Sequence, residues 1–323
     1  MLEVKDLWVK YRSQHGRSVS AVRGVNFSIP DGTFMGLVGE SGCGKSTLGF
    51  AIARLLNSQQ LEISGSVLLN GEDLIKMSSR ELRKLRWDKI AIVLQGGMNA
   101  FNPVLKIKQQ FTDVMKAHGQ GRAEDRDQRI AELLRHVQLD PALLEAYPHE
   151  LSGGMKQRVA IALSLVLNPE LVILDEPTTA LDVIVQKAIV EMLQELQRHM
   201  KFSVLFISHD LGLVLEAAER VMVMYAGKIV EEEPVEVLLE GAKHPYTEAL
   251  LSCYGDPQAK ELRFKGIPGS PPDLSKPLQG CSFVPRCSKA MSACRELEPQ
   301  RLELERGAVA CHLYTKMQGG IGK

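Results

Sequence analysis

One short stretch near the N-terminus constrains this chain more than any other feature. After the apolar run Leu37-Val38, residues 39–47 read Gly-Glu-Ser-Gly-Cys-Gly-Lys-Ser-Thr, with the spacing G-x-x-x-x-G-K-[ST]. Glycines at this spacing let backbone N–H groups turn inward and surround an anion with no Cβ in the way. The preceding run predicts a strand and residues 47–53 predict a helix, so a bound phosphate would lie at a helix N-terminus.

This segment, residues 39–47, is called the phosphate loop below. Its Lys45 can reach the β- and γ-phosphates of a nucleotide, and the Ser46 hydroxyl can ligate Mg²⁺. A chance glycine-rich turn is the alternative, and the flanking strand and helix patterns argue against it. The candidate nucleotide-contacting residues here are Gly39, Ser41, Gly42, Cys43, Gly44, Lys45, Ser46 and Thr47.

Composition and charge exclude several classes of protein. The 323 residues suffice for one large or two modest domains. Lys plus Arg and Asp plus Glu each number 39, and this balance argues against a general nucleic-acid binder. No run approaches 18 apolar residues and no charged-then-apolar leader opens the chain, so we expect neither a membrane span nor a secretion signal. We therefore expect a cytosolic protein that reaches a membrane only by binding a membrane protein.

Strand-like and helix-like segments alternate along the chain. Strands are predicted at about 2–9, 21–29, 33–38, 64–71, 89–94, 171–175, 203–207 and 221–225. Helices are predicted at about 47–53, 126–137, 151–167, 182–200 and 211–218. This alternation predicts an α/β domain with a mainly parallel sheet.

A second nucleotide element is the run Leu-Val-Ile-Leu-Asp-Glu at residues 171–176. Asp175, at the end of a buried strand, can hold Mg²⁺ through water, and Glu176 can orient and deprotonate an attacking water. An Asp-Glu pair alone would more often be a solvated strand end. The phosphate loop in the same chain favours the catalytic interpretation.

Residues 151–158, Leu-Ser-Gly-Gly-Met-Lys-Gln-Arg, resemble the signature sequence of ABC-transporter ATPases. They occur together with Leu-Asp-Glu-Pro-Thr-Thr-Ala-Leu-Asp at residues 174–182, a combination that no other phosphate-loop class carries. Ser152 offers a hydroxyl, and Gly153 and Gly154 offer N–H groups ahead of a helix. The resemblance implies that they contact the γ-phosphate held by a partner subunit, with two ATPs between two head-to-tail ATPase domains.

The same resemblance implies roles for single residues elsewhere. Gln95 matches the Q-loop glutamine, which senses Mg²⁺ or water and faces the permease, and His209 matches the switch histidine at the γ-phosphate. Asp182 matches the D-loop aspartate that couples the two sites, and Tyr11 matches the aromatic that stacks on adenine, with Trp8 as competitor. The implied catalytic residues are Lys45, Gln95, Glu176 and His209, and the implied Mg²⁺ ligands are Ser46, Gln95 and Asp175.

One departure from the family pattern follows Gln95. Residues 96–99 read Gly-Gly-Met-Asn, where many relatives carry an acidic residue and a proline. The two glycines allow more backbone freedom at the implied permease contact. Glu176 and the signature are intact, so the resemblance still implies a subunit that hydrolyses ATP.

The C-terminal part resembles the tail of oligopeptide/dipeptide-type importer ATPases. The matching segments are residues 244–247 (His-Pro-Tyr-Thr), 267–272 (Ile-Pro-Gly-Ser-Pro-Pro) and 280–287 (Gly-Cys-Ser-Phe-Val-Pro-Arg-Cys). Four cysteines complete it with the spacing Cys-x5-Cys-x6-Cys-x16-Cys, at Cys281, Cys287, Cys294 and Cys311.

Clustered cysteines in a cytosolic protein suggest a metal site more than disulfides. Four cysteines hold either Zn²⁺ or an iron–sulfur cluster. No C-x2–4-C pair occurs here, and relatives with these cysteines carry a 4Fe–4S cluster, so the resemblance favours the cluster over Zn²⁺. Unligated thiols are disfavoured because clustered free cysteines oxidise readily. We expect a structural role for the cluster, and no metal role for Cys43 or Cys253.

The predicted architecture is an α/β phosphate-loop NTPase of the ABC ATPase type. It has a mainly parallel core sheet, an antiparallel N-terminal β subdomain, and a helical signature subdomain at about 96–160. We assign residues 1–234 to the ATPase domain and 235–323 to a C-terminal metal-cluster extension, with residues 319–323 predicted to be disordered.

The resemblance implies the ATP-binding and hydrolysing subunit of a membrane importer for di- or oligopeptides, with nickel or oligosaccharide as alternative cargoes. The implied partners are a second ABC ATPase, two transmembrane permease subunits and an extracytoplasmic substrate-binding protein. A heterodimer of ATPases is favoured over a homodimer, and the implied location is the cytoplasmic face of the membrane. Two other classes fit less well: a DNA-repair or translation ATPase would show a second cassette or a coiled-coil insertion, and an iron- or redox-sensing module would have a defective nucleotide site.

Overall fold

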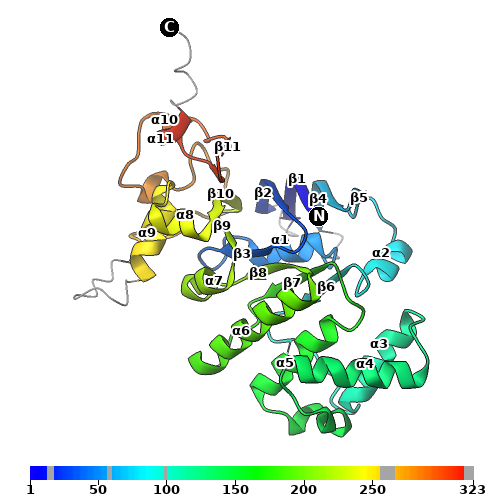
Figure 1. Ribbon diagram of the computed structural model, residues 1–323. Helices are drawn as coiled ribbons and strands as arrows, with labels where there is room; N and C mark the ends of the chain where they lie inside the picture. Colours follow the sequence, from blue (N-terminus) through cyan, green and yellow to red (C-terminus); the bar gives the residue numbers. More distant parts are fainter. Residues whose placement is uncertain (13–17, 57–59, 98–99, 255–265, 316–323) are drawn as a thin grey trace. The chain divides into compact units, whose positions relative to one another are not determined.

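The computed structural model describes residues 1–12, 18–56, 60–97, 100–254 and 266–315 (Figure 1). The chain forms two compact units. Unit 1 contains residues 1–2, 29–34 and 76–208, and unit 2 contains residues 3–28, 35–75 and 209–323. Residues 319–323, which the sequence predicts to be disordered, lie outside the described residues. So do Met98 and Asn99, which belong to the segment after Gln95 that departs from the family pattern.

Unit 2 contains a four-stranded N-terminal sheet in the order β2-β1-β4-β5. Its strands are β1 (Leu2–Arg12), β2 (Ser18–Ile29), β4 (Leu61–Leu69) and β5 (Glu72–Asp73). Strands β4 and β5 pair antiparallel across Asn70-Gly71, both of which have positive φ. Asn-Gly supplies the two left-handed residues that a tight hairpin needs. The antiparallel N-terminal subdomain is confirmed.

A second group of strands in unit 2 leads to the phosphate loop. Its strands are β3 (Phe34–Val38), β9 (Arg220–Tyr225), β10 (Lys228–Pro234), β11 (Leu302–Glu303) and β12 (Ala308–Val309). Strand β3 runs parallel to β9, β9 pairs antiparallel with β10, and β10 pairs antiparallel with β12. Residues of the C-terminal part therefore extend this sheet by way of β12 and β11.

Short helices accompany these strands in unit 2. They are α1 (Lys45–Ile52), α7 (Leu211–Ala217), α8 (Val235–Glu240), α9 (Pro245–Tyr254), α10 (Ala293–Glu296) and α11 (His312–Thr315), with a 3-10 turn at Val284–Arg286. The predicted domain boundary at residue 234 falls between β10 and α8 and stays a prediction.

Unit 1 is built on three parallel strands. They are β6 (Ile90–Val93), β7 (Leu171–Asp175) and β8 (Ser203–Ile207), with β7 paired to both of the others. Every residue of β7 and β8 is buried, as expected for parallel strands covered on both faces, which explains their uninterrupted apolar sequences. The amphipathic helix α6 (Val183–Met200) connects β7 to β8.

The remaining helices of unit 1 begin with one at Ser79–Leu85, which the sequence did not predict, and continue into the stretch at about 96–160 that it predicted to be helical. They are α2 (Ser79–Leu85), α3 (Ile107–Ala117), α4 (Ala123–His136) and α5 (Gly153–Ser164), with 3-10 turns at Pro141–Glu145 and Pro148–Glu150. Apolar side chains of α3 and α4 are buried at helical spacing, among them Phe111 and Leu133.

Candidate active site

The phosphate loop follows β3 directly and leads into α1 in unit 2. Its backbone approaches neighbouring strands so closely that glycine is required at two positions. At Gly39, with φ of 154°, a Cβ would lie 2.2 Å from the carbonyl oxygen of Met224. At Gly44, with φ of 109°, it would lie 2.2 Å from the carbonyl oxygen of Ala21. The G-x-x-x-x-G spacing is thus explained by this packing.

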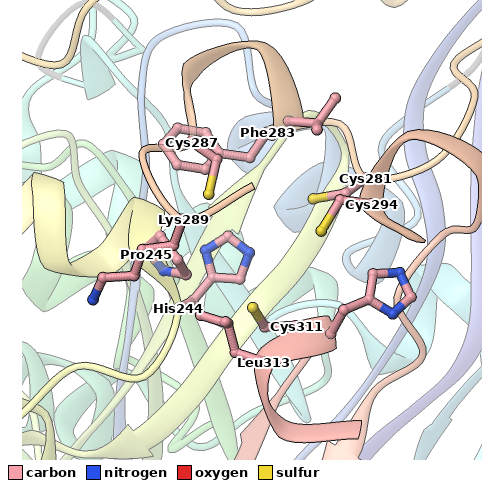
Figure 2. A pocket seen from close by; sticks show the side chains of 11 residues that line it. His244, Pro245, Cys281, Phe283, Cys287, Lys289, Cys294, Cys311 and Leu313 are labelled. Atoms are coloured by element: carbon pink, nitrogen blue, oxygen red, sulfur yellow. The ribbon is translucent and has the colours of Figure 1, made fainter. Parts of the chain in front are cut away.

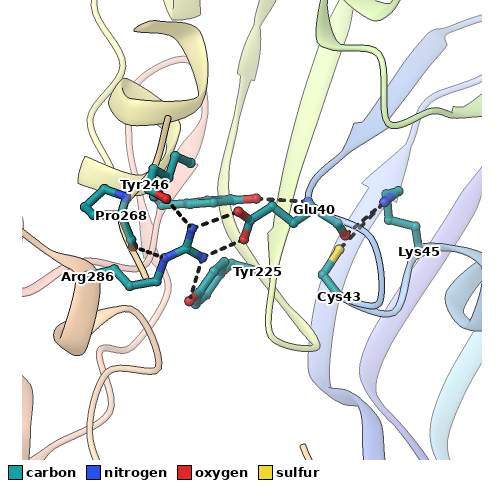
Figure 3. Close-up of polar contacts among 8 residues, drawn as sticks. Glu40, Cys43, Lys45, Tyr225, Tyr246, Pro268 and Arg286 are labelled. Carbon is teal, nitrogen blue, oxygen red and sulfur yellow. Dashed lines mark hydrogen bonds and ion pairs between the residues drawn. The ribbon is translucent and has the colours of Figure 1, made fainter. Parts of the chain in front are cut away.

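Lys45 lies inside the loop and is 5% exposed. Its Nζ donates to the carbonyl oxygens of Gly39 at 2.7 Å and of Glu40 at 3.2 Å. The contact with Glu40 can be followed in Figure 3. Burial raises the pKa of the neighbouring Cys43 thiol, which therefore remains protonated. Among residues 39–47, Lys45 is the one basic residue, so its ammonium is the full positive charge of the phosphate loop.

The two aromatic candidates for adenine stacking have different surroundings. The Tyr11 hydroxyl donates to Oγ1 of Thr47 at 3.4 Å, which places Tyr11 beside the first turn of α1. The Trp8 indole N–H donates to Oδ1 of Asp6 at 2.8 Å, and its ring packs over Gly24. Contact with the phosphate loop favours Tyr11 as the adenine-side residue.

In unit 1 the structure brings together two predicted catalytic residues that are 81 positions apart. Glu176 follows β7, and its Oε2 accepts hydrogen bonds from Nε2 of Gln95 and from Oγ1 of Thr179, each at 3.0 Å. The Glu176 N–H donates to the carbonyl oxygen of Ile207 at 2.9 Å, which fixes the backbone of the residue that follows β7. The preceding Asp175 is 1% exposed. The side chains of Gln95 and Thr179 therefore hold the Glu176 carboxylate in a defined orientation.

The signature residues and the predicted D-loop aspartate begin two helices of unit 1. Ser152 caps α5, where its Oγ accepts from the N–H of Met155 at 3.3 Å. Asp182 caps α6, where its Oδ1 accepts from the N–H of Val185 at 3.0 Å. A Cβ at Gly154 would lie 2.9 Å from Cγ1 of Val185, so the first turns of these helices pack together. Gly153 is the first residue of α5.

His209 is exposed and precedes α7 in unit 2. The next residue, Asp210, caps this helix by accepting from the N–H of Leu213 at 3.1 Å. His209 therefore lies directly before the N-cap residue of α7, at an accessible point of the chain.

The four cysteines singled out in the sequence line one pocket in unit 2 (Figure 2). His244 and Phe283 also line it, and the N–H of Cys281 donates to the carbonyl oxygen of Cys294 at 2.8 Å. Burial raises the pKa of Cys281 and Cys287, and that of Cys311 to about 11. Across the described ranges, no three His, Cys, Asp or Glu side chains are grouped so that they could hold a metal ion.

Each unit also contains a contact that the sequence did not predict. Thr179, which orients Glu176, lies inside a motif that was recognised as a whole, with no role given to this residue. Glu40 of the phosphate loop forms an ion pair with Arg286, 246 positions away, with Nη1 of Arg286 2.7 Å from Oε2 of Glu40. No periodicity or spacing in the sequence links residues so far apart.

Comparison with known proteins identifies the family. Residues 22–179 match the ABC transporter family, and residues 230–294 match the C-terminal region of oligopeptide/dipeptide transporters. The dipeptide transport ATP-binding protein DppD of Caldanaerobacter subterraneus subsp. tengcongensis is 40% identical over 319 residues, covering 98% of each chain. The oligopeptide transport ATP-binding protein OppD of Bacillus subtilis is 41% identical over 303 residues, covering 93% of this chain and 84% of that protein.

Solved structures agree with this result. A dimeric bacterial ABC transporter cassette matches with a TM-score of 0.65 and 30% identity, covering 73% of this chain and 99% of that one. A dimeric post-hydrolysis state of an ATP-binding cassette, with ADP and Pi bound, matches equally well. The predicted phosphate-loop fold of the ABC type is confirmed. The chain belongs to the ABC-transporter ATPases, as an ATP-binding subunit of the oligopeptide/dipeptide importer type whose activity is ATP hydrolysis coupled to transport.

Proposed function

We propose that Glu176 is the general base of this ATPase and that ATP hydrolysis here powers the uptake of di- or oligopeptides. The observation that carries the catalytic assignment is the Glu176 carboxylate held by Gln95 and Thr179 at the end of β7. A general base must be oriented before it can take a proton from water in the transition state. Two hydrogen bonds from side chains that come from different segments supply that orientation.

The other predicted residues supply charge and position. Lys45 and the N–H groups of the phosphate loop neutralise phosphate charge, while Tyr11 packs against adenine. The water oxygen attacks the γ-phosphorus, the bond to the ADP oxygen breaks, and the Glu176 carboxylate takes the proton. His209 stabilises the γ-phosphate. The residues that would hold Mg²⁺ are Ser46, Gln95 and Asp175, and the ion when bound neutralises charge on the β- and γ-phosphate oxygens.

A second ATPase subunit is the proposed partner for the signature residues. Ser152, Gly153 and Gly154 would reach the γ-phosphate of that partner, and Asp182 would couple the two sites. Val183 and Ile184 follow Asp182 and are 78% and 82% exposed. Exposed apolar side chains of this kind favour a docking surface. The similarity to a dimeric cassette supports this arrangement, and we favour a heterodimer with a related ATPase.

We place the complex at the cytoplasmic face of the membrane, with two permease subunits and an extracytoplasmic substrate-binding protein. In the described parts of the chain, no helix is both long and apolar enough to cross a bilayer. Val104 is 75% exposed, in the segment after Gln95 where the family resemblance implies permease contact. Membrane attachment would then depend on the permease subunits.

Uptake measurements distinguish the possible cargoes. In cells that lack this chain, we expect loss of uptake of a labelled di- or tripeptide, restored by the wild-type chain and not by Glu176→Gln. Labelled nickel and a labelled oligosaccharide serve as parallel cargoes. Unchanged peptide uptake together with lost nickel or oligosaccharide uptake would contradict the peptide assignment and leave the ATPase assignment intact.

We further propose that Cys281, Cys287, Cys294 and Cys311 hold a 4Fe–4S cluster, with Zn²⁺ as the alternative. Thiolates are the ligands such clusters take, and all four thiols line the same pocket. Four irons occupy more space than one ion, so cluster ligands need not converge on one point. The shared pocket is the observation that supports this proposal. Bound metal would stabilise the tail, because metal binding adds folding free energy.

Metal analysis tests this assignment. After anaerobic purification we expect about four irons and four sulfides per chain with a broad brown absorbance, the composition of one 4Fe–4S cluster. Cys287→Ser should lower the iron content, while Cys253→Ser, outside the pocket, should not. One zinc per chain with no sulfide would contradict the cluster and support a plain structural zinc site.

A further inference from the structure

The side chain of Arg286, in the C-terminal part of unit 2, forms an ion pair with Glu40 of the phosphate loop (Figure 3). Nη1 and Nη2 of Arg286 lie 2.7 and 2.9 Å from the two carboxylate oxygens of Glu40, the second residue of the loop. The Arg286 side chain is 4% exposed. Two parallel N–H···O contacts between planar groups fix direction as well as distance, and burial limits screening by solvent.

The guanidinium is itself held by the surrounding chain. Its Nε donates to the carbonyl oxygen of Pro268 at 2.8 Å, and Nη2 also donates to that of Ile267 at 3.2 Å. Nη1 also donates to the Tyr225 hydroxyl at 3.4 Å. Together with the two contacts to Glu40, these bonds use all five N–H donors of an arginine. Arg286 is therefore pre-positioned, and Glu40 is the group that it holds.

A second contact fixes the backbone of the same residue. The N–H of Glu40 donates to the hydroxyl of Tyr246 at 3.0 Å. Tyr246 is fully buried, with its ring centroid 4.6 Å from that of Tyr225 and 5.4 Å from that of Phe283. This aromatic cluster gives the Tyr246 hydroxyl a fixed place. Both the side chain and the backbone of Glu40 are thus set by residues outside the loop.

The constraint on Glu40 reaches the phosphate-binding lysine. The carbonyl oxygen of Glu40 accepts from Nζ of Lys45 at 3.2 Å, and the adjacent Gly39 carbonyl oxygen accepts at 2.7 Å. A shift of Glu40 would therefore move the acceptors that position the ammonium. A loop already held in its binding conformation loses less conformational freedom when it closes around a ligand.

We propose that Arg286 is a positioning residue for nucleotide binding: from the C-terminal part of the chain it fixes Glu40 and holds the phosphate loop in the shape that receives the ATP phosphates. Tyr246 acts in the same direction through the Glu40 backbone. This inference rests on the proposed assignment of residues 39–47 as the phosphate-binding segment.

Arg301 provides a matched control. It also belongs to the C-terminal part, and it pairs with Glu232 at 2.9 Å and with Glu303 at 2.8 Å. Neither carboxylate belongs to the phosphate loop. If Arg286 only anchored the tail, Arg286→Gln and Arg301→Gln should lower the melting temperature and leave nucleotide affinity unchanged.

The test measures the Kd of a fluorescent ATP analogue with Mg²⁺, and kcat and KM for ATP, on the full chain. For Arg286→Gln we expect Kd and KM to rise about tenfold, or about 1.4 kcal/mol, with kcat within about twofold of wild type. Arg286→Lys should recover part of the affinity, because it keeps the charge and loses the fork. Glu40→Gln combined with Arg286→Gln should bind no more weakly than Arg286→Gln alone, since one pair is removed in each case.

Unchanged Kd in a folded Arg286→Gln variant would overturn the inference. The variant Lys45→Ala tests the assignment of residues 39–47 as the phosphate-binding segment. Lost ATP binding in Lys45→Ala together with normal binding in Arg286→Gln would refute only the role of Arg286. Normal binding in Lys45→Ala would refute the loop assignment itself. If Arg286→Gln does not fold, Tyr246→Phe keeps the ring and removes the acceptor. A severalfold rise in Kd would then support the inference, and an unchanged Kd would overturn it.

Discussion

Glu176→Gln is expected to lower ATP turnover by about 10²- to 10⁴-fold, the range typical for loss of a general base. Glutamine has nearly the same shape as glutamate, and its amide oxygen can still accept hydrogen bonds from Gln95 and Thr179, which now lie 3.0 Å from Oε2 of Glu176. The amide cannot accept a proton from water at neutral pH. Folding and ATP binding should therefore persist while hydrolysis is lost, and ATP should trap a dimer.

The measurement is steady-state phosphate release, with ATP affinity and size-exclusion elution followed on the same samples. Glu195→Gln, an exposed position on α6, makes the same chemical change away from the site and should behave as wild type. Near-normal turnover in Glu176→Gln would show that another group takes the proton. Loss of ATP binding as well would indicate that Glu176 supports the site and does not act as its base.

The sequence was sufficient to predict the functional segments that are contiguous in the chain. The phosphate loop, the apolar strand β7 and its terminal Asp175-Glu176 pair are each contiguous, so spacing and hydrophobicity specify them. Even the contact between Gln95 and Glu176 follows from topology, because β6 and β7 are parallel neighbours and their carboxyl ends meet at one edge.

Local capping explains where the prediction of helix α5 was inaccurate. The sequence predicted a helix at about 151–167, whereas α5 covers Gly153–Ser164. Ser152 adopts an extended conformation and its side chain accepts from the N–H of Met155, so the helix begins at Gly153, two residues after the predicted start. At the other end, Leu165 has φ of −95° and ψ of 0°, and ends the regular hydrogen-bonding pattern.

Contacts between distant segments could not be predicted in the same way. The pairing of Glu40 with Arg286 depends on the backbone carbonyl groups at residues 267–268, on two tyrosines and on the path of the chain between them. A sequence pattern specifies which face of a helix or strand is apolar. It does not specify which charged side chain from a distant segment will pair with a given residue. Arg286 was therefore visible as part of a family motif and had no role until the structure placed it beside Glu40.

Gly44→Ala, which adds a single methyl group to the phosphate loop, is expected to cause a large loss of stability. Gly44 has φ of 109°, and the added Cβ would lie 2.2 Å from the backbone carbonyl oxygen of Ala21. A backbone atom cannot rotate away as a side chain can, so either strand β2 or the start of α1 must move. Backbone strain and overpacking each cost about 1–3 kcal/mol, so we expect the free energy of unfolding to fall by roughly 3 kcal/mol.

The variant Gly42→Ala distinguishes the cost of backbone strain from the cost of overpacking. Gly42 also has positive φ, 78°, yet no atom lies within 4 Å of the point that an added Cβ would occupy, so only the backbone strain applies. Thermal unfolding without nucleotide should therefore rank wild type above Gly42→Ala, with Gly44→Ala lowest. If the start of α1 is the part that moves, Gly44→Ala should also lose ATP binding, because Lys45 is the first residue of that helix. Equal melting temperatures for the two variants would mean that the loop moves away from Ala21 without cost. The close approach to β2 would then not be what requires glycine at position 44.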